Sequence, residues 1–220
     1  MKYRFTNRTG GNSTGAFAYL NLGTHVGDDL GAVQSNRELL TQEFGPIQFM
    51  SQVHGNRVAV IESFTDVDPT CDALVTGIQG ISLAVQVADC IPLLLHSPQS
   101  IAAVHVGRKG LLNDVTLSAL EIMRAMGADQ ITAIIGPSIC GRCYEVSEEI
   151  YREVVAQHPE ARSETKSGTL ALDLSAALCK VLEGEGLTVI NEGRCTVEDS
   201  ELFSYRRDGA TGRQAGIICL

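Results

Sequence analysis

Two histidines and one cysteine stand in segments that otherwise have the composition of buried strands. His54 follows the segment "SQV", Cys90 ends "QVADC", and His105 interrupts the apolar run "IAAVHV". They lie far apart in the chain, unlike the ligands of a zinc finger, which come from local knuckles. Two imidazoles and one thiolate are a known zinc-binding combination that leaves a fourth position open. Zinc in such a site lowers the pKa of a bound water towards about 7.

The same residues have other interpretations. A strand cysteine is often just a small buried hydrophobic residue, and a strand histidine is more often a hydrogen-bonded core residue than a ligand. Cys90 and His105 could instead form a metal-free thiolate–imidazolium pair that hydrolyses acyl or amide bonds. A non-catalytic protein that binds a partner and keeps a vestigial site is a third class. Residue types and spacing alone leave these alternatives open.

Two carboxylates are candidates for acid–base catalysis, Asp72 and Asp89. Asp89 precedes Cys90 directly, so in an extended strand the two side chains point to opposite faces. Both can reach one metal only where the chain bends, and Pro92, which cannot donate to a sheet ladder, favours a bend or an edge nearby. The remaining histidines have weaker contexts and are interpreted as structural: His25, His96 and His158.

The turn "GRKG" stands at a predicted strand-to-helix junction, two residues after His105. Its backbone N–H groups, the helix N-terminus and the cations Arg108 and Lys109 predict a seat for phosphate or another anion beside the metal. A solvated basic turn is the alternative.

The pair Cys140 and Cys143 in "CGRC" could bind a metal or act in redox chemistry. Because no second CxxC completes a zinc site, we favour the interpretation that these two cysteines have neither role.

Composition limits the function further. The chain has 220 residues, 44% hydrophobic and 20% charged, with a net charge of −9. These values indicate a globular protein that binds neither nucleic acid nor an anionic membrane. No run approaches the roughly 18 apolar residues of a membrane span, and "MKYRFTNRTGG" has no apolar leader segment. Seven cysteines without such a leader suggest a reducing compartment, so we expect a cytoplasmic protein.

Periodicity and capping residues predict the elements that must position these side chains. Helices are expected from Asp28–Asp29 to about Phe44, after the "GRKG" turn up to Gly127, from Ser147 to Pro159, and from Asp173 onward. Strands are expected in "PIQFMSQVHG", "RVAVIES", "DALVT", "ISLAVQVADC", "IPLLLHS", "IAAVHV" and "ITAIIGPSI", and near "LFSYRR". The interleaved order predicts a single α/β domain over residues 1–220, with mixed β-sheets flanked by helices.

Several of these motifs, in this order, resemble the YfiH-type family, whose members carry the names purine nucleoside phosphorylase, adenosine deaminase and laccase. The similar segments run through most of the chain: "GGNSTGAFAYLNLGTHVGDD", "NRELL", "SQVHGNRV", "DALVT", "ADCIPLLL", "AAVHVGRKG", "IGPSICGRCYEV" and "FSYRRDGATGRQAGII". Carried over by motif, the family's zinc ligands fall on His54, Cys90 and His105. The resemblance therefore implies a YfiH-like fold with one zinc per chain.

The resemblance also implies a reaction. Purine nucleosides (adenosine, inosine, guanosine or methylthioadenosine) would be split by inorganic phosphate into base and ribose-1-phosphate, and adenosine would be deaminated to inosine. Lys109, Arg108 and Arg57 are the expected phosphate-binding cations, with Lys109 also counted as catalytic. Asp72 and Asp89 are the expected proton donors, and a homodimer is one option for the assembly.

This chain departs from the family in one motif, and one of the family's names does not suit its residues. The family carries a Trp-Arg pair where this chain has Arg108-Lys109, so a bidentate guanidinium is replaced by a point charge and we expect weaker phosphorolysis. The laccase name fits the residues poorly, because four coppers need on the order of ten imidazoles and the chain has five histidines. We therefore expect no multicopper oxidation.

Overall fold

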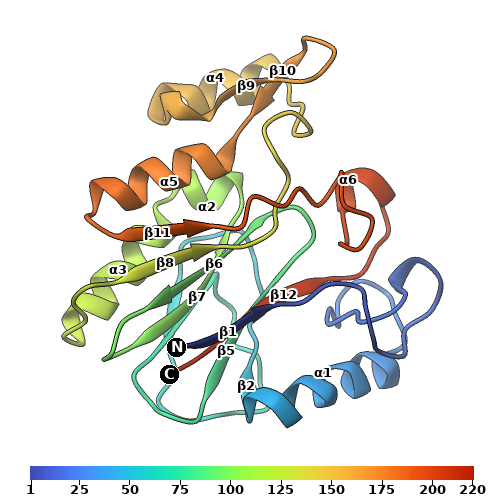
Figure 1. Cartoon of the computed structure of the whole chain (residues 1–220), viewed down its shortest axis with the longest axis vertical. Coiled ribbons are helices and arrows are strands. Elements are labelled where there is room, and N and C mark those ends of the chain that lie inside the picture. The colour runs from blue at the N-terminus through green and yellow to red at the C-terminus, as the bar shows by residue number, and fades with distance from the viewer.

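A computed structural model describes all residues, 1–220, and shows a domain of four layers (Figure 1). Two β-sheets pack face to face, and helices cover the outer face of each. The single-domain α/β fold with mixed sheets is thus as the sequence predicts. The strands are β1 (Lys2–Phe5), β2 (Ile47–Gln48), β3 (Val58–Val60), β4 (Ala73–Thr76), β5 (Ser82–Val87), β6 (Ile91–His96), β7 (Ile101–Val106), β8 (Thr132–Ile135), β9 (Arg162–Glu164), β10 (Leu170–Leu172), β11 (Thr188–Asn191) and β12 (Gln214–Cys219).

Several helices begin after a capping side chain. Asp29, Ser147 and Asp173 each accept a hydrogen bond from a backbone N–H of the first turn of the helix that they precede. Gly127, with φ of +86°, follows the end of one helix, as predicted. The helices are α1 (Leu30–Phe44), α2 (Arg108–Leu112), α3 (Val115–Ala125), α4 (Glu148–Gln157), α5 (Leu174–Gly184) and α6 (Tyr205–Asp208), with short 3₁₀ turns at Gly15–Phe17 and Pro159–Ala161.

The larger sheet has six strands in the order β11-β8-β6-β7-β4-β3. The central hairpin of β6 and β7 is antiparallel and places Pro92 opposite His105. Alternate residues of each strand belong to different cores, as the two-residue strand period requires. Leu93 and Leu95 of β6 pack towards α3 and α5, whereas Leu94 packs towards the other sheet.

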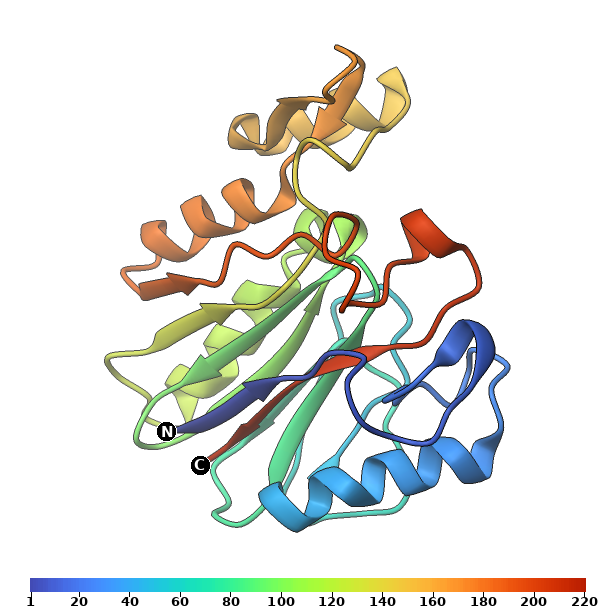
Figure 2. The same cartoon turned by 45° about the vertical axis from the view of Figure 1, so that its right-hand side comes forward.

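The smaller sheet has four strands in the order β1-β12-β5-β2. β1 and β12 pair antiparallel, so both chain termini lie at one edge of the molecule (Figure 2). Leu83 and Val85 of β5 face the larger sheet, and Ala84 faces Leu40 and Phe44 of α1. The core between the two sheets ends beside the β5–β6 turn, and the functional site lies there.

Some predicted elements differ from the structure. "LFSYRR" is not a strand, because Ser204 caps the short helix α6 and the last strand, β12, starts only at Gln214. The segment "PIQFMSQVHG" contributes only Ile47–Gln48 to a sheet, and the helix after "GRKG" is interrupted at Asn113–Asp114. Strands β1, β9, β10 and β11 were not predicted; they are at most four residues long.

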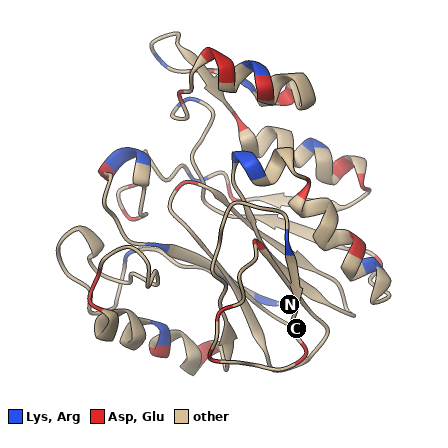
Figure 3. Cartoon of the chain, turned by 180° about the vertical axis from the view of Figure 1, so that it is seen from behind, with Lys and Arg blue, Asp and Glu red and all other residues tan.

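The surface of the molecule carries both signs of charge. Acidic and basic residues are interspersed on the helices, and this view shows no continuous basic face (Figure 3). None of the helices is both long enough and apolar enough to cross a membrane.

Candidate active site and metal centre

His54, Cys90 and His105 meet at one end of the core between the two sheets. Their ligand atoms all lie within 4.8 Å of one another. The His54 Nε2 atom is 3.9 Å from the Cys90 Sγ atom, and the two imidazole rings stand edge to face with centroids 4.7 Å apart. The three residues that sequence and resemblance single out are therefore brought together as a possible metal centre.

Each ligand comes from a different element. His105 is in β7 and follows Ile101 and Ala103 on the face that meets the smaller sheet, so its ring reaches the end of that core. Cys90 lies in the turn between β5 and β6, where Asp89 takes a φ of +104°. The chain therefore bends at the position where the sequence requires a bend. His54, with φ of +59°, lies in the loop before β3.

The backbone leaves room between the ligands. A Cβ atom on Gly107 would lie 3.0 Å from the Cys90 Sγ atom and 3.2 Å from the His54 ring. Because such a contact crowds both side chains, only glycine fits beside the ligand set without a shift. The open space and the nitrogen–nitrogen–sulfur donor set both suit a zinc ion.

Asp72 is fully buried and holds both histidines in place. Its Oδ1 atom lies 2.8 Å from His105 Nδ1 and accepts the backbone N–H of His54 at 2.8 Å. Its Oδ2 atom accepts the N–H groups of Gly55 at 2.7 Å and Val53 at 3.2 Å. A proton on His105 Nδ1 leaves Nε2 free to bind a metal. Asp72 does not line the cavity and can act there only through His105, so the structure gives it a positioning role; its role as a proton donor stays a prediction.

Electrostatics favour a charged cysteine. Burial alone would raise the pKa of the Cys90 thiol, but the charge and hydrogen bonds of His105, supported by His54, bring it down to about 6. Burial opposes protonation of His105, yet the Cys90 thiolate and the Asp72 carboxylate raise its pKa to about 9. The thiolate is the form of cysteine that binds metals and acts as a nucleophile.

Asp89 lies at the wall of the site, but hydrogen bonds occupy its carboxylate. Oδ1 accepts the hydroxyls of Thr196 at 2.6 Å and Ser204 at 2.7 Å, and Oδ2 accepts the backbone N–H of Arg206 at 2.7 Å. These bonds hold the segment at Thr196 and the start of α6 against the β5–β6 turn. Asp89 therefore has a structural role in this turn, and its acid–base role stays a prediction.

A cavity of about 400 Å³ opens onto the ligand set, a volume within the range of small-molecule sites, about 300–1,000 Å³. Sequence reasoning missed most of its wall, which comes from loops distant in the chain. Besides the three ligands, its lining includes His25, Gln52, Gln86, Asp89, Ile139, Tyr144, Tyr205, Arg206 and Arg213. His25, interpreted from the sequence as structural, thus belongs to the cavity wall. The only sequence signal for the arginines was the basic segment "FSYRRDGATGR".

Arg206 and Arg213 are the cations of this cavity. Arg213 donates to the carbonyls of Thr211 at 3.0 Å and Gly212 at 2.9 Å, and burial lowers its pKa. Arg206 donates to the carbonyl of Glu145 at 2.9 Å and lies over the Tyr144 ring, 5.2 Å from its centroid. Neither arginine makes an ion pair with a carboxylate, so their charge is available to an anion.

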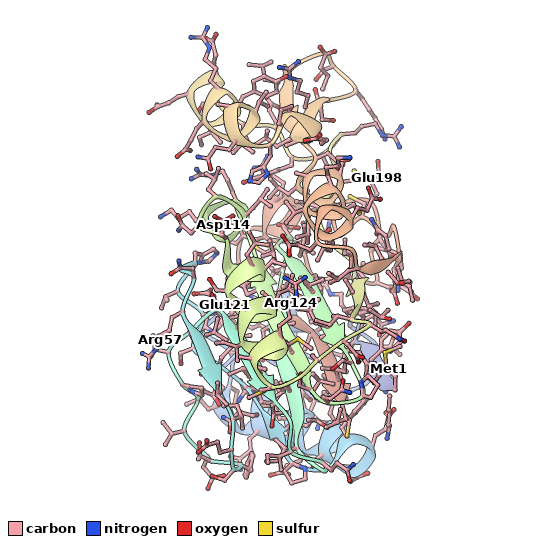
Figure 4. The ribbon with its side chains drawn as sticks, turned by 90° about the vertical axis from the view of Figure 1, so that its left-hand side faces the viewer. Met1, Arg57, Asp114, Glu121, Arg124 and Glu198 are labelled. Carbon is pink, nitrogen blue, oxygen red and sulfur yellow. The ribbon has the colours of Figure 1, made fainter.

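The structure does not bring the three predicted phosphate-binding cations into this cavity. Arg108 and Lys109 line a second hollow together with Ser147 and Glu149, and Arg108 pairs with Glu153 at 2.7 Å. Both belong to the helix α2, which begins at Arg108. Arg57 is exposed, and its side chain points outward from the body of the molecule (Figure 4). The two cations of the "GRKG" turn therefore line a different hollow, although Gly107, the first residue of this turn, lies beside Cys90 and His54.

Comparison with known proteins identifies relatives along the whole chain. The family model described as multi-copper polyphenol oxidoreductase laccase matches residues 2–220. A purine nucleoside phosphorylase from Streptomyces coelicolor is 46% identical over 99% of this chain and 95% of its own length. A purine nucleoside phosphorylase from Corynebacterium glutamicum is 44% identical over 98% of this chain and 93% of its own length.

Solved structures show the same fold. A Neisseria meningitidis protein superposes with a TM-score of 0.91 at 36% identity, covering 100% of this chain and 93% of the other. The hypothetical protein YfiH from Bacillus licheniformis superposes with a TM-score of 0.89 at 28% identity, covering 98% and 91%. The YfiH-type resemblance inferred from the motifs is thereby confirmed.

Proposed function

This chain belongs to the multi-copper polyphenol oxidoreductase laccase family, and from this membership we propose that it is a zinc-dependent purine nucleoside phosphorylase. Curated relatives at 42–46% identity carry the name purine nucleoside phosphorylase. The single observation that carries the proposal is the cavity itself. It joins a two-histidine, one-cysteine ligand set to two unpaired arginines and two tyrosines in one space.

The zinc would be held by His54, Cys90 and His105. When bound, it would supply a Lewis acid that polarises an oxygen at the floor of the cavity. Asp72 prepares the site for it, because its hydrogen bonds to His105 Nδ1 and to the His54 backbone orient both imidazoles.

Phosphorolysis joins a phosphate oxygen to the ribose C1′ atom as the bond from C1′ to the purine nitrogen breaks, and the base leaves with a proton. Arg206 and Arg213 are the phosphate-binding residues of the proposal. A guanidinium without a carboxylate partner offers paired N–H donors to a phosphate, which strengthens binding and fixes orientation. Arg213 is anchored by two backbone carbonyls, so its remaining donors are held towards the cavity.

The nucleoside would lie between the arginines and the aromatic wall. Tyr144 and Tyr205 present rings to the cavity, and tyrosine combines a flat apolar surface with a hydroxyl. Burial and the nearby Cys90 raise the pKa of Tyr144, which keeps its phenol protonated. These properties suit a purine ring, which is flat and has polar edges.

Deamination of adenosine is proposed as a second reaction of the same cavity. It exchanges the amino group at the purine C6 position for a water oxygen and needs no phosphate. The two reactions therefore share the metal ligands but differ in their dependence on Arg206 and Arg213. Multicopper oxidation is not proposed, because only two of the five histidines, His54 and His105, belong to the ligand set.

A metal-free cysteine hydrolase is the second candidate. The observation that favours it is the series Cys90, His105 and Asp72, which has the order of a nucleophile, a base and an orienting carboxylate. It predicts a chain that is active without zinc, loses activity on alkylation of Cys90, and acts on acyl or amide bonds.

The test is a product analysis of the zinc-loaded protein with inosine, with and without phosphate. Hypoxanthine and ribose-1-phosphate are expected only when phosphate is present. Arg206→Ala and Arg213→Lys should each raise the KM for phosphate about ten- to a hundred-fold, the effect of losing a charged hydrogen bond worth about 1.5–3 kcal/mol. Adenosine deamination by the same variants should change much less.

Lys109→Ala is the matched control, because this cation lies outside the cavity. It should leave the KM for phosphate unchanged. Base release at the same rate with and without phosphate would contradict the proposed phosphate site. A larger increase in the KM for phosphate with Lys109→Ala than with Arg206→Ala would contradict it as well.

A further inference from the structure

A second group of metal-binding side chains lies outside the site described above. The sulfur atoms of Cys140, Cys143 and Cys195 all lie within 4.8 Å of one another. Cys140 and Cys143 form the "CGRC" turn after β8, and Cys195 follows β11. The sequence showed no partner for this CxxC pair because the third sulfur is more than fifty residues away. The His54, Cys90 and His105 set is therefore not the only group of three possible metal ligands in the chain.

Backbone pairing fixes the third cysteine against the turn. β11 runs parallel to β8, and the pairing continues beyond both strands as a bridge between Ser138 and Cys195. The N–H of Ser138 donates to the carbonyl of Arg194 at 3.1 Å, and the N–H of Thr196 donates to the carbonyl of Ser138 at 3.1 Å. Cys195 thus reaches the two other sulfurs through the register of the sheet, and it is buried there.

The turn itself has the form of a metal-binding knuckle. The N–H groups of Cys143 and Tyr144 both donate to the carbonyl of Cys140, at 3.0 and 3.1 Å, which folds the two sulfurs onto one side. The N–H of Cys140 points at the Cys195 Sγ atom at 3.4 Å, a contact that stabilises a thiolate. At Gly141 an added Cβ would lie 2.7 Å from the Ser163 hydroxyl oxygen, so the tight turn requires glycine.

We propose that Cys140, Cys143 and Cys195 bind a second Zn²⁺ ion, which has a structural role. Thiolates are common zinc ligands in structural sites, which hold the ion with four ligands and often include a CxxC pair; the three sulfurs would supply three of the four. Cys140 and Cys143 are only partly buried, so water or a neighbouring carboxylate can supply the fourth ligand. A disulfide would join two of the sulfurs and leave the third unused, whereas one metal ion uses all three.

The ion would stabilise one wall of the cavity. Ile139 and Tyr144 flank the "CGRC" turn, and both line the cavity. The N–H of Ile139 donates to the carbonyl of Asp89 at 2.9 Å, and the Thr196 hydroxyl, next to Cys195, donates to the Asp89 carboxylate. The three-cysteine site therefore connects the β8 and β11 ends of the larger sheet to the turn that carries Cys90.

The test is elemental analysis of protein produced with zinc and purified under reducing conditions. Two zinc ions per chain are expected for the unchanged protein. Cys143→Ser should retain one, Cys90→Ser should retain one, and the double variant should retain none. Cys219→Ser is the matched control, because this cysteine lies in β12 outside both ligand groups, and it should retain two.

Cobalt binding provides a second, spectroscopic measurement of the three-cysteine site. Co²⁺ added to metal-free Cys90→Ser protein should give the intense sulfur-to-cobalt charge-transfer bands of a thiolate site, and the bands should be absent from the double variant. A single zinc per chain that disappears with Cys90→Ser and is unaffected by Cys143→Ser would overturn the proposal. A Cys140–Cys143 disulfide in the reduced preparation, detected by mass spectrometry, would overturn it as well. Neither measurement involves nucleosides. A failure of the second zinc site would therefore leave the proposed function standing.

Discussion

The carboxylate of Asp72 makes four hydrogen bonds and contacts both candidate histidine ligands, whereas the sequence suggested only an acid–base role for it. It therefore determines the geometry of the metal centre without being a ligand. The sequence singled out the three candidate ligands through the histidines and the cysteine of apolar segments and through the resemblance to the family, and the structure brings them together. It could not identify Arg206 and Arg213, since their approach to the cavity depends on the path of a long C-terminal loop.

The variant Asp72→Asn tests this positioning role. One amide oxygen cannot accept from His105 and from three backbone N–H groups, so both imidazoles lose their fixed orientation. We expect zinc affinity at the His54 site to fall about 10–100-fold, the usual effect of losing a partner of a metal ligand. Competition with a chromophoric chelator measures it, best in a Cys143→Ser background that isolates this site.

Asp129→Asn, the same substitution at an exposed residue, is the control and should leave zinc affinity unchanged. An Asp72→Asn variant with normal zinc affinity but lower thermal stability would show that the carboxylate only supports the fold.

At the scale of elements, the site depends on where strands end and turn. β6 and β7 were predictable because both are continuous apolar runs, buried on both faces. The short strands β1, β9, β10 and β11 carry no such run and are specified by their partners in the sheet. "LFSYRR" has the composition of a strand, but the Ser204 cap and its hydrogen bond to the Arg207 N–H form a helix instead.

The packing between the two sheets holds β5, β6 and β7 in register, and Leu94 is at its centre with no exposed surface. Leu94→Ala should lower the free energy of unfolding by about 2–5 kcal/mol through lost burial and a residual cavity. Denaturant unfolding measures the change. Val60→Ala, at a side chain that is 42% exposed in β3, should change it by less than about 0.5 kcal/mol. Equal effects of the two substitutions would mean that the inter-sheet core is not what stabilises the fold.

At the scale of the whole molecule, the two sheets and several loops meet at one end of the sandwich. The larger sheet supplies His105, the turn between the sheets supplies Cys90, and the segments around α6 and β12 supply the cations. A chain with a net charge of −9 thereby concentrates two arginines without carboxylate partners beside the candidate metal centre. The sequence predicted a positive site at the "GRKG" turn instead.

The most direct measurement is metal reconstitution of phosphorolysis. Protein freed of metal by a chelator is titrated with zinc, and inosine cleavage by phosphate is followed together with the zinc bound. We expect the metal-free protein to be inactive, the unchanged protein to regain activity with zinc, and His54→Ala to remain inactive at the same zinc concentrations. Full phosphorolysis by metal-free protein, or recovery by His54→Ala equal to that of the unchanged chain, would contradict a zinc centre at His54, Cys90 and His105.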